Sequence, residues 1–483
     1  MALILPFNTS TKRVAILGGG VTGLAAAYRL AKMGHIVRIF EQSGRLGGAI
    51  RTEMTGGWLV EAGPQSLRET STLVSMVMRG IGVHKTRVNA SETARRRYIV
   101  RKGRPCPVPT SGPGLLVSGL FSPWAKVRIL GDLLRRPRPQ APDRSFAHFI
   151  REHCGREAAD TVGQALAAGI YAGDAEMLSA RHSFPQLWNF DHLHGSFLRG
   201  HEAHLKACEK RHESGIPAVF SFQRGMQTLT HALVLQLPAD VVVLNARVEA
   251  LVPGPRWQVI WRDMRNRPGS VDDDWSKTDD SDRQVEGFDA VVSALPAIAM
   301  SRLEFGARNE CPMAAMAGLP YAPLASLFLG YRRDQVAHPL DGSGLLAPPR
   351  EGRSLLGVVF SSSTFPGRAP DGHVALTVMA GGVRQPAIAA LSAEELVAAV
   401  TPDLRALLGV KGDPVFMRHS YWPRAIPQYN MGHVRFNQTM SQCEKKHRGF
   451  FIGGHARDGV SVADCIMSGE RLAEKAASYD PIE

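Results

Sequence analysis

The fold is decided by the stretch VAILGGGVTGLAAAYRLAKMGHIVRIFEQSGRLGGAI, residues 14–50. Its first apolar run, residues 13–17 when Arg13 is included, is typical of a buried parallel strand. A glycine-rich turn follows, and a helix is predicted from about 22 to 33. A second strand is predicted at 36–40, with Glu41 at its end. This order of elements is typical of a βαβ unit that binds a dinucleotide.

The turn has the spacing Gly18-x-Gly20-x-x-Gly23. Glycines at these positions let the backbone turn tightly, let a pyrophosphate approach the helix N-terminus and let the helix pack on the strand. The Glu41 carboxylate can accept hydrogen bonds from an adenosine ribose. The motif therefore predicts a bound dinucleotide and leaves NAD and FAD open.

Composition limits the classes of protein. With 483 residues, the chain is long enough for two or three domains, and its 44% hydrophobic content is typical of a globular protein. The net charge of +13 suits acidic ligands, anionic lipid or nucleic acid, although a solvated basic surface gives the same charge. Six cysteines without a Cys-x-x-Cys pair favour a reduced compartment and argue against a disulfide framework or a zinc knuckle.

No export signal is expected, because the apolar run of residues 1–13 is too short. The longest uncharged run, 311–331, is broken by Pro320 and Pro323, and it predicts a short helix, a turn and a buried strand at 324–331. No transmembrane helix is expected. We therefore expect a cytoplasmic protein, with peripheral contact to the cytoplasmic face of the membrane as an open extension.

Further glycine motifs resemble the flavin amine oxidase superfamily. GRLGGAI at 44–50 resembles the Arg-x-Gly-Gly signature that lines FAD there, and EAGPQSL at 61–67 fits the next turn beside the flavin. The remaining matches are FQRGMQTLTHAL (222–233), VVVLNARVEAL (241–251), FDAVVSALP (288–296) and GFFIGGHARDGVSVADCIMSGERLAEKA (449–476). The resemblance implies an FAD-binding domain built from three dispersed segments.

We expect an α/β fold with α+β insertions: a Rossmann-like FAD-binding domain, a helical membrane-facing domain and a mixed-sheet substrate domain. The predicted boundaries are 1–94, 216–296 and 416–483 for the FAD-binding domain, 95–215 for the helical domain and 297–415 for the substrate domain. The acidic loop 263–287 is expected to be mobile.

The first insertion has helix-compatible stretches at 123–136, 144–168 and 192–213. It interleaves arginines and lysines with apolar residues such as Trp124, which favours an anionic membrane surface, although an ordinary charged helix face remains open. Six histidines lie between 182 and 212, but HEAH at 201–204 lacks the zinc spacing, and no metal site is expected.

The second insertion has alternating patterns that predict four strands. Their expected ranges are 324–331, 343–347, 354–362 and 373–381. Such a sheet could form one wall of a large apolar pocket that faces the flavin, or its leucines and methionines could be ordinary core.

Motifs outside the FAD segments resemble the protoporphyrinogen oxidase family of haem and porphyrin biosynthesis. They include RRRYIVRKGRPCPVP (95–109), AAGIYAGDAEMLSARHSFPQL (167–187), YAPLASLFLGY (321–331), GLLAPPREGRSLLGVVFSSSTFP (344–366), LTVMAGGVRQP (376–386) and WPRAIPQYNMGH (422–433). The resemblance implies that an FAD enzyme removes six electrons from protoporphyrinogen IX, with hydride transfer from a methylene bridge to flavin N5. O2 would be the acceptor and H2O2 a product. The flavin carries this chemistry, so no catalytic side chain is nominated.

The resemblance also implies positions for both ligands. For the substrate, Arg97 would hold a propionate, Gly169 would offer its carbonyl to pyrrole N–H groups, and Leu345, Leu346 and Met379 would line the macrocycle. For non-covalent FAD the expected contacts are Gly18, Gly19, Gly20, Val21, Thr22, Gly23, Glu41, Gln42, Arg45, Gly47, Gly48, Ala49, Gly63, Pro64, Gln65, Val248, Trp422, Gly454, Val460, Ser461 and Val462.

The chain departs from the family at Gln65, at Arg457-Asp458 and at Ala463, which leaves the substrate and the electron acceptor open. The alternatives are coproporphyrinogen III as substrate, another flavin amine oxidase or a desaturase, and a non-catalytic binding protein with the same fold. Expected partners are a porphyrinogen, O2, an anionic membrane, a ferrochelatase that receives the product and a second copy in a homodimer. No nucleic acid is expected.

Overall fold

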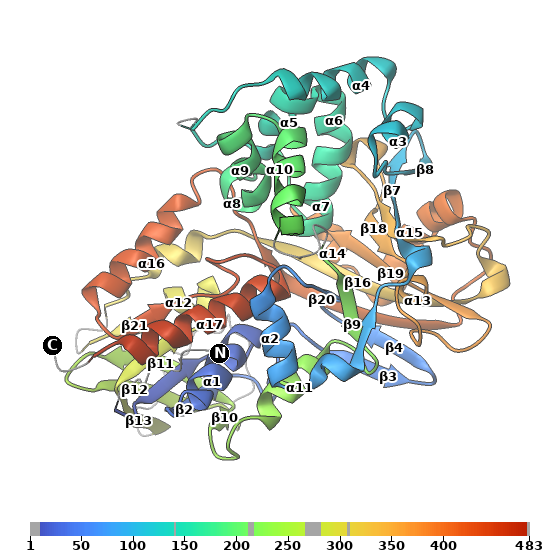
Figure 1. The fold of residues 1–483 in the computed structure, drawn as a ribbon. Helices are drawn as coiled ribbons and strands as arrows, with labels where there is room; N and C mark the ends of the chain where they lie inside the picture. The colour runs from blue at the N-terminus through green and yellow to red at the C-terminus, as the bar shows by residue number, and fades with distance from the viewer. Residues whose placement is uncertain (1–9, 140–141, 211–216, 266–281, 307–309, 481–483) are drawn as a thin grey trace.

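The computed structural model describes residues 10–139, 142–210, 217–265, 282–306 and 310–480. Figure 1 shows three regions: a nucleotide lobe at the lower left with both marked termini, a broad sheet at the right and a helical module above both. Most of the loop predicted at 263–287 lies outside the described residues.

The nucleotide lobe is built on a five-stranded parallel sheet in the order β10-β2-β1-β14-β21. The strands are β10 (Val242–Leu244), β2 (Ile36–Glu41), β1 (Arg13–Leu17), β14 (Ala290–Ser293) and β21 (Phe450–Ile452). The three predicted segments therefore contribute neighbouring strands of one sheet, which confirms the dispersed Rossmann-like domain.

Two helices from opposite ends of the chain pack together on this sheet (Figure 1). They are α1 (Val21–Lys32) and α17 (Val462–Ser478). Their backbones approach closely, because a Cβ added to Gly469 of α17 would lie 2.5 Å from the Thr22 carbonyl oxygen of α1. This approach brings the last motif of the sequence beside the first glycine turn.

Smaller elements surround the nucleotide lobe. The antiparallel strands are β11 (Ala246–Val252), β12 (Trp257–Asp263) and β13 (Arg283–Phe288), with β15 (Glu304–Phe305) parallel to β11. A hairpin joins β3 (Thr52–Thr55) to β4 (Trp58–Glu61), and a three-stranded sheet contains β5 (Leu67–Arg68), β9 (Val219–Phe222) and β6 (Arg87–Asn89). The helices here are α2 (Thr72–Gly80), α11 (Gln227–Leu235), α12 (Ala297–Ser301) and α16 (Val434–Lys446).

The broad sheet has seven strands in the order β20-β16-β19-β18-β17-β7-β8. The strands are β20 (Phe416–Pro427), β16 (Tyr321–Arg332), β19 (His373–Gly381), β18 (Leu355–Val359), β17 (Gly342–Leu346), β7 (Arg96–Arg101) and β8 (Arg104–Pro107). The four strands predicted in the second insertion are confirmed.

The domain boundaries predicted at 95 and 416 separate strands that belong to this one sheet. Strands β7 and β8 lie in the segment predicted as helical, and β20 lies in the last FAD segment, yet all three belong to the broad sheet. The reason is strand pairing: β20 runs antiparallel along almost all of β16, and β7 pairs with β17. Pairing between distant segments leaves no local signal in a sequence.

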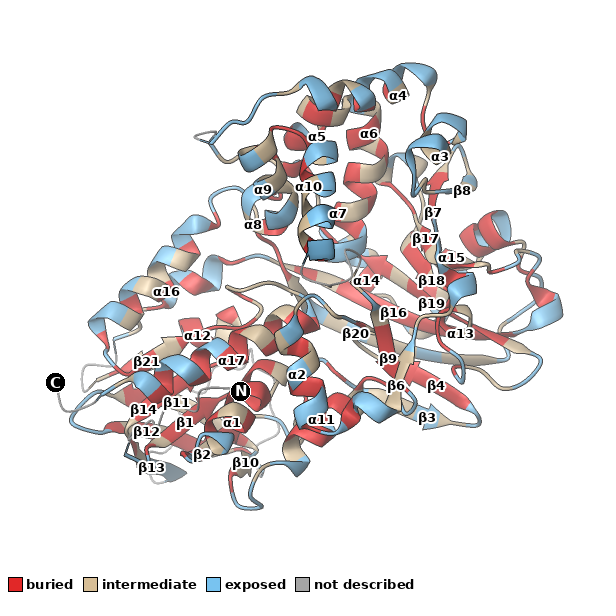
Figure 2. Cartoon of the chain, in the orientation of Figure 1, coloured by how far each residue is buried: buried red, intermediate tan, exposed pale blue. Residues whose placement is uncertain are grey.

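One face of the broad sheet is closed by α15 (Ala393–Leu408), which packs its leucines and valines on the strands. The central strands β16 and β19 are mostly buried, whereas the edge strands β20 and β8 are mostly half-buried or exposed (Figure 2). The short helices α13 (Ser361–Thr364) and α14 (Pro386–Ala389) lie at strand ends. The other face is turned toward the helical module (Figure 1).

The helical module contains α3 to α10. Its helices are α3 (Gly112–Val117), α4 (Pro123–Leu130), α5 (Phe146–Cys154), α6 (Arg156–Ala158), α7 (Gln164–Tyr171), α8 (Ala180–Ser183), α9 (Pro185–His194) and α10 (Phe197–Lys210). A π-helical turn, Ala159–Gly163, joins α6 to α7. Within the described residues, no helix combines the length and apolar character needed to cross a bilayer.

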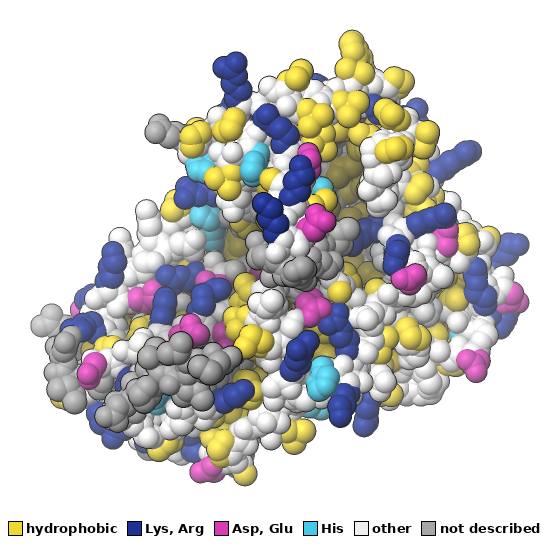
Figure 3. Space-filling model, viewed as in Figure 1, with side chains coloured by type: hydrophobic (Ala, Val, Ile, Leu, Met, Phe, Trp, Pro, Cys, Tyr) yellow, Lys and Arg dark blue, Asp and Glu magenta, His cyan; other side chains and the backbone are white. Residues whose placement is uncertain are grey.

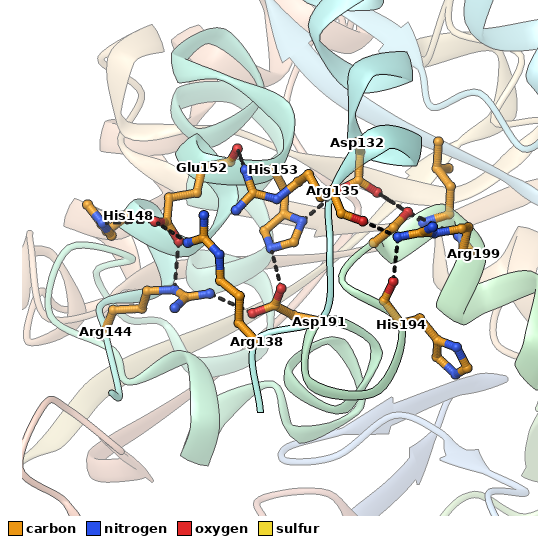
Figure 4. A network of polar contacts seen from close by, with 12 residues as sticks. Asp132, Arg135, Arg138, Arg144, His148, Glu152, His153, Asp191, His194 and Arg199 are labelled. Carbon is orange, nitrogen blue, oxygen red and sulfur yellow. Dashed lines mark hydrogen bonds and ion pairs between the residues drawn. The ribbon is translucent and has the colours of Figure 1, made fainter. Parts of the chain in front are cut away.

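A buried polar network fixes these helices to one another (Figure 4). His153 of α5 lies between two carboxylates, with Nδ1 2.6 Å from Asp132 Oδ1 and Nε2 3.3 Å from Asp191 Oδ1. Asp132 also accepts hydrogen bonds from Ser196 Oγ and the Leu198 N–H. The network therefore joins α5, α9, the start of α10 and the turn after α4.

Candidate active site

The glycine turn after β1 has a geometry that excludes side chains at two positions. Gly18 has a φ of +100°, which favours glycine, and its N–H donates to the Phe40 carbonyl at 2.9 Å. A Cβ on Gly23 would lie 1.9 Å from the Gly18 carbonyl oxygen. Strand β1 and helix α1 therefore meet at a distance that glycine alone permits.

The N-terminus of α1 is free to meet an anion. Gly20 is the N-cap, no side chain caps the helix, and its first turn contains no acidic residue. A Cβ on Gly20 would meet no atom within 4 Å. Val21 and Thr22 begin the helix, and its N-terminus, with no capping side chain and no acidic residue, would favour a pyrophosphate.

Glu41 ends β2 beside this turn, as predicted. Its Oε2 accepts a hydrogen bond from the Gly19 N–H at 2.8 Å, and its Oε1 accepts one from the Ser43 N–H at 2.8 Å. The half-buried Gln42 follows it directly. The carboxylate is therefore held at the carboxyl end of the parallel sheet, where ligands of such folds bind.

The second glycine cluster folds back onto the first. The Gly47 N–H donates to the Gly19 carbonyl at 2.8 Å. Arg45 donates to the Gly48 carbonyl at 2.6 Å, so it stabilises the loop. Ala49 at the end of the cluster is exposed.

The turn at Gly63 and Pro64 closes on this cluster. A Cβ on Gly63 would lie 2.0 Å from the Ala49 carbonyl oxygen. Trp422 of β20 donates its indole N–H to the Ala62 carbonyl at 2.8 Å, and Gln65 accepts a hydrogen bond from Ser361 Oγ at 3.3 Å. The turn therefore joins the nucleotide lobe to the broad sheet.

The last motif reaches the same crevice. Gly454, with a φ of +98°, lies beside Thr22, because an added Cβ would be 3.5 Å from Thr22 Oγ1. Ser461 caps α17 through a capping box with Asp464. Val460 packs against the helical module, and Val462 lies in the core of the nucleotide lobe. Val248 lies at the register shift between β11 and β12. Its side chain is partly buried and packs against the hydrophobic core of the nucleotide lobe.

Arg457 and Asp458, where the sequence departs from the family pattern, form hydrogen bonds within the protein. Arg457 donates to Glu444 at 2.9 Å and to the Ile452 carbonyl at 2.9 Å. Asp458 accepts from the Gly454 N–H at 3.1 Å. These two side chains stabilise the closing turn. Ala463 is buried in α17.

The broad sheet presents one row of side chains toward the helical module. Leu346 and Met379 share this row, since both are in register with Gly357. The row continues from Met379 to Ser326 and from Leu346 to Ile99. The sheet therefore brings two of the predicted substrate residues together on one surface.

Gly169 of α7 faces this row. A Cβ at Gly169 would lie 2.7 Å from Leu346 Cδ2. The end of α7 is fixed by two hydrogen bonds, from Gln428 Nε2 to the Tyr171 carbonyl at 2.7 Å and from the Val383 N–H to the Ala172 carbonyl at 2.9 Å. A side chain at Gly169 would collide with Leu346, so the glycine lets α7 pack closely on this part of the row.

Leu345 lies elsewhere. Its side chain is 2% exposed and belongs to the core under α15, on the opposite face of the broad sheet. The reason is the alternation of side chains along β17, which sends neighbouring residues to opposite faces. We therefore leave Leu345 out of the proposed substrate surface.

Arg97 lies on the same face of β7 as Ile99, the residue in register with Leu346. Two residues along a strand correspond to about 7 Å. The Arg97 side chain is exposed, so the structure puts a cation at one end of the apolar row. Figure 3 shows the molecule hollowed between the helical module and the lobes below, with hydrophobic side chains inside.

The sequence reasoning did not select His455, which follows Gly454 at the crevice. Its Nε2 is 3.0 Å from the Tyr321 hydroxyl, and burial lowers its pKa to about 4. The imidazole is therefore neutral at pH 7. Its position directly after the glycine pair, at the carboxyl end of the last strand, is the feature of the sequence that could have indicated a site residue.

Comparison with known proteins identifies the family. The profile described as flavin-containing amine oxidoreductase matches residues 21–477. The chain belongs to this family. The mitochondrial protoporphyrinogen oxidase of Nicotiana tabacum is 32% identical, with 98% of this chain and 96% of the relative covered. The coproporphyrinogen III oxidase of Bacillus subtilis is 25% identical, with 97% and 98% covered.

A solved structure supports the fold. A provisionally named protoporphyrinogen oxidase from Exiguobacterium sp. 255-15 superposes with a TM-score of 0.78 at 21% identity, covering 97% of this chain and 99% of that one. Members of the family are flavoproteins, and this chain is an FAD-dependent oxidoreductase.

The residues present fit FAD. The uncapped α1 N-terminus, the open space at Gly20 and the Glu41 carboxylate form a continuous cradle for a dinucleotide. The Gly63 turn and Trp422 carry this cradle toward the broad sheet. Within the described residues, no group of three or more His, Cys, Asp or Glu side chains is placed to hold a metal ion.

Proposed function

We propose that the protein oxidises protoporphyrinogen IX to protoporphyrin IX in porphyrin biosynthesis, with O2 as the final acceptor and H2O2 as a product. The observation that carries this proposal is the surface formed by Leu346, Met379 and Gly169, with Arg97 at its end. A flat apolar wall that ends in a cation suits a macrocycle that carries carboxylates at one edge.

Bound FAD would supply the acceptor for a hydride from a methylene bridge of the substrate. The chain itself contributes placement. Leu346 and Met379 would support one face of the macrocycle, and the Gly169 carbonyl would orient the pyrrole N–H groups. Helix α7 would exclude water from the other face. No side chain needs to act as acid or base, because the remaining hydrogens can move by tautomerisation within the ring.

The alternative substrate is coproporphyrinogen III, the substrate in the name of the Bacillus subtilis relative. It carries four carboxylates, two more than protoporphyrinogen IX, and the two additional carboxylates would lie over the apolar wall. Burial of a charged group without a partner is unfavourable. The apolar character of the Leu346 and Met379 row therefore favours the less charged substrate.

The proposal is tested by product stoichiometry. Purified FAD-loaded protein is mixed with protoporphyrinogen IX in air, and porphyrin fluorescence and H2O2 are measured together. Removal of six electrons predicts three H2O2 for each porphyrin. Porphyrin formation that does not exceed the rate of a flavin-free control would contradict the proposal.

We also propose that the tip of the helical module contacts anionic lipid. Exposed apolar side chains gather there, as Figure 3 shows. They are Leu116, Val117, Trp124, Val127, Leu130, Leu133 and Leu134. Lys126, Arg128, Arg135, Arg136 and Arg138 lie among them in the sequence. This mixture of apolar and basic residues suits the interface of an anionic bilayer.

Vesicle binding tests this contact. Trp124→Ser and Leu134→Ser, at side chains 80% and 86% exposed, should reduce co-sedimentation with phosphatidylserine vesicles. Leu235→Ser is the matched control, because Leu235 is 81% exposed on the nucleotide lobe. Equal effects of all three variants would contradict a specific surface. Transfer of product to a ferrochelatase and a homodimer stay predictions.

A further inference from the structure

The three consecutive arginines 95–97 differ in their partners. Arg95 makes an ion pair with Glu92, and Arg96 makes one with Asp341. Among the described residues, the Arg97 guanidinium has no hydrogen-bond or ion-pair partner. Arg97 is exposed on the face of β7 that carries Ile99, so its charge is free to meet an anion at the end of the apolar row.

Arg68 is a second arginine of this kind. It ends β5, where its neighbour Leu67 is buried in the core of the nucleotide lobe, so the Arg68 side chain points away from that core. In the part of the chain that the structure describes, this guanidinium also has no polar partner. Most of the arginines that the structure describes do have one.

Hydrogen bonds connect the segments that carry Arg68 and Arg97. Ser361 Oγ donates to Gln65 Oε1 at 3.3 Å, three residues before Arg68, and the neighbouring Phe360 N–H donates to the Ser343 carbonyl at 3.1 Å. Ser343 Oγ in turn donates to the carbonyl of Arg96, directly before Arg97, at 3.4 Å.

Arg68 is accessible to solvent, yet the surrounding protein removes much of its hydration. This desolvation, with repulsion from the Arg97 charge added to it, lowers the pKa of Arg68. Figure 3 shows basic side chains beside the hollow under the helical module.

Arg68 is also close in the chain to the predicted flavin site. It lies shortly after the Gly63 and Pro64 turn, which closes on the second glycine cluster. Strand β5 is held by pairing of Arg68 with Val219 of β9. The Arg68 backbone therefore belongs to the nucleotide lobe, whereas Arg97 belongs to the broad sheet.

On the basis of the proposed porphyrinogen oxidation, we propose that Arg68 binds a second carboxylate of the substrate beside the one held by Arg97. Two guanidinium groups repel each other until an anion lies between them, and each can bind a carboxylate through two parallel hydrogen bonds. Protoporphyrinogen carries its two propionates on neighbouring pyrroles. The pair Arg68 and Arg97 matches this dianionic edge.

The test pairs arginine variants with esterified substrates. The variants are Arg68→Gln, Arg68→Lys and Arg97→Gln, with Arg95→Gln as the control in the same segment. KM and kcat are measured by porphyrin fluorescence with protoporphyrinogen IX and with its dimethyl ester. FAD content and melting temperature are measured for each protein, so that misfolded variants are recognised and Arg68→Lys serves in place of a misfolded Arg68→Gln.

With the diacid, Arg68→Gln should raise KM at least about tenfold with kcat nearly unchanged, which corresponds to about 1.4 kcal/mol of lost binding. Arg68→Lys should recover part of this loss, since charge remains without the planar fork. With the dimethyl ester, wild type and Arg68→Gln should have the same KM. Arg95→Gln should match wild type with both substrates.

Two results would overturn the assignment of Arg68. One is an unchanged KM for the diacid in a folded Arg68→Gln variant. The other is an equal rise of KM for the diacid and the dimethyl ester, because that effect would not depend on a carboxylate. Wild-type protein that oxidises neither substrate would instead contradict the proposed function, and the carboxylate pair would fall with it.

Discussion

At the scale of single residues, Leu345 and Leu346 are neighbours in β17 with different surroundings. Leu345 is 2% exposed beneath α15, whereas Leu346 is half-buried under Gly169 on the face toward the helical module. The resemblance placed both in the substrate surface. The alternation along a strand was available from the sequence, but the face that meets the ligand depends on the packing of α15 and α7.

This difference gives a prediction with its own control. Leu345→Ala should destabilise the fold by about 2–5 kcal/mol, because it leaves a cavity in a packed core, and should leave KM unchanged. Leu346→Ala should raise KM for the porphyrinogen with a smaller loss of stability. Melting temperatures and steady-state kinetics of the two variants provide the check. A reversed pattern would mean that the ligand lies on the α15 side of the sheet.

Other site residues were predictable because their chemistry is local. The glycines at 18, 20 and 23 and Glu41 follow from the spacing of one βαβ unit, and the structure places them as expected. Arg68 could not be found in this way. Its proposed role depends on the hydrogen bonds that connect its segment, through Ser361 and Ser343, to the segment of Arg97, and those contacts form only when the two lobes pack together.

At the scale of elements, the buried network around His153 holds the helical module together (Figure 4). Burial alone would raise the pKa values of Asp132 and Asp191, but hydrogen bonds and the charge of His153 lower both. Arg144 contributes to the lowering at Asp191 and also pairs with Glu152 at 2.9 Å. A sequence pattern with many histidines in this segment does not reveal which one is buried.

We predict that Asp132→Asn loosens the module. Removal of one partner from a buried charged pair costs about 3 kcal/mol, so amides of α5, α9 and α10 should exchange hydrogen about a hundred times faster at pH 7. Amides of α1 and β1 should be unaffected. Asp160→Asn is the control, because the Arg156 and Asp160 pair is exposed and contributes at most about 1 kcal/mol. Similar exchange in the two variants would contradict this role.

The contribution of Asp132 to the stability of the folded protein should change with pH in a definite direction. A carboxyl whose pKa is lowered by folding stabilises the protein above its unfolded pKa, about 3.9 for Asp, and loses this contribution as pH falls through the folded value. The melting temperatures of wild type and Asp132→Asn should therefore differ most near pH 7 and converge below about pH 4. A constant difference across this range would show that Asp132 is not ionised in the folded protein.

The residue ranges of the strands were predicted more successfully than the pairing of one strand with another. Ranges such as 373–381 follow from alternation and flanking turns, and β19 has these bounds. The assignment of β7, β8 and β20 to one sheet could not be predicted, because each lies in a segment dominated by other elements. Hydrogen bonding between segments hundreds of residues apart is decided by the whole fold.

At the scale of the whole molecule, the chain passes several times between its lobes. The Gly63 turn, Trp422 and α7 each contact elements of another lobe, so the site exists only when all lobes are assembled. The dinucleotide crevice and the apolar row meet along these contacts. The proposed oxidoreductase site is therefore shared between lobes.

The central claim is that a porphyrinogen delivers electrons to FAD held in this crevice. The measurement that tests it most directly is anaerobic bleaching of the bound flavin, with protoporphyrinogen IX and coproporphyrinogen III mixed separately with the purified protein. We predict rapid loss of oxidised-flavin absorbance with protoporphyrinogen IX and little change with coproporphyrinogen III. Bleaching by coproporphyrinogen III alone would reverse the substrate assignment. Persistence of the oxidised spectrum with both would contradict the account.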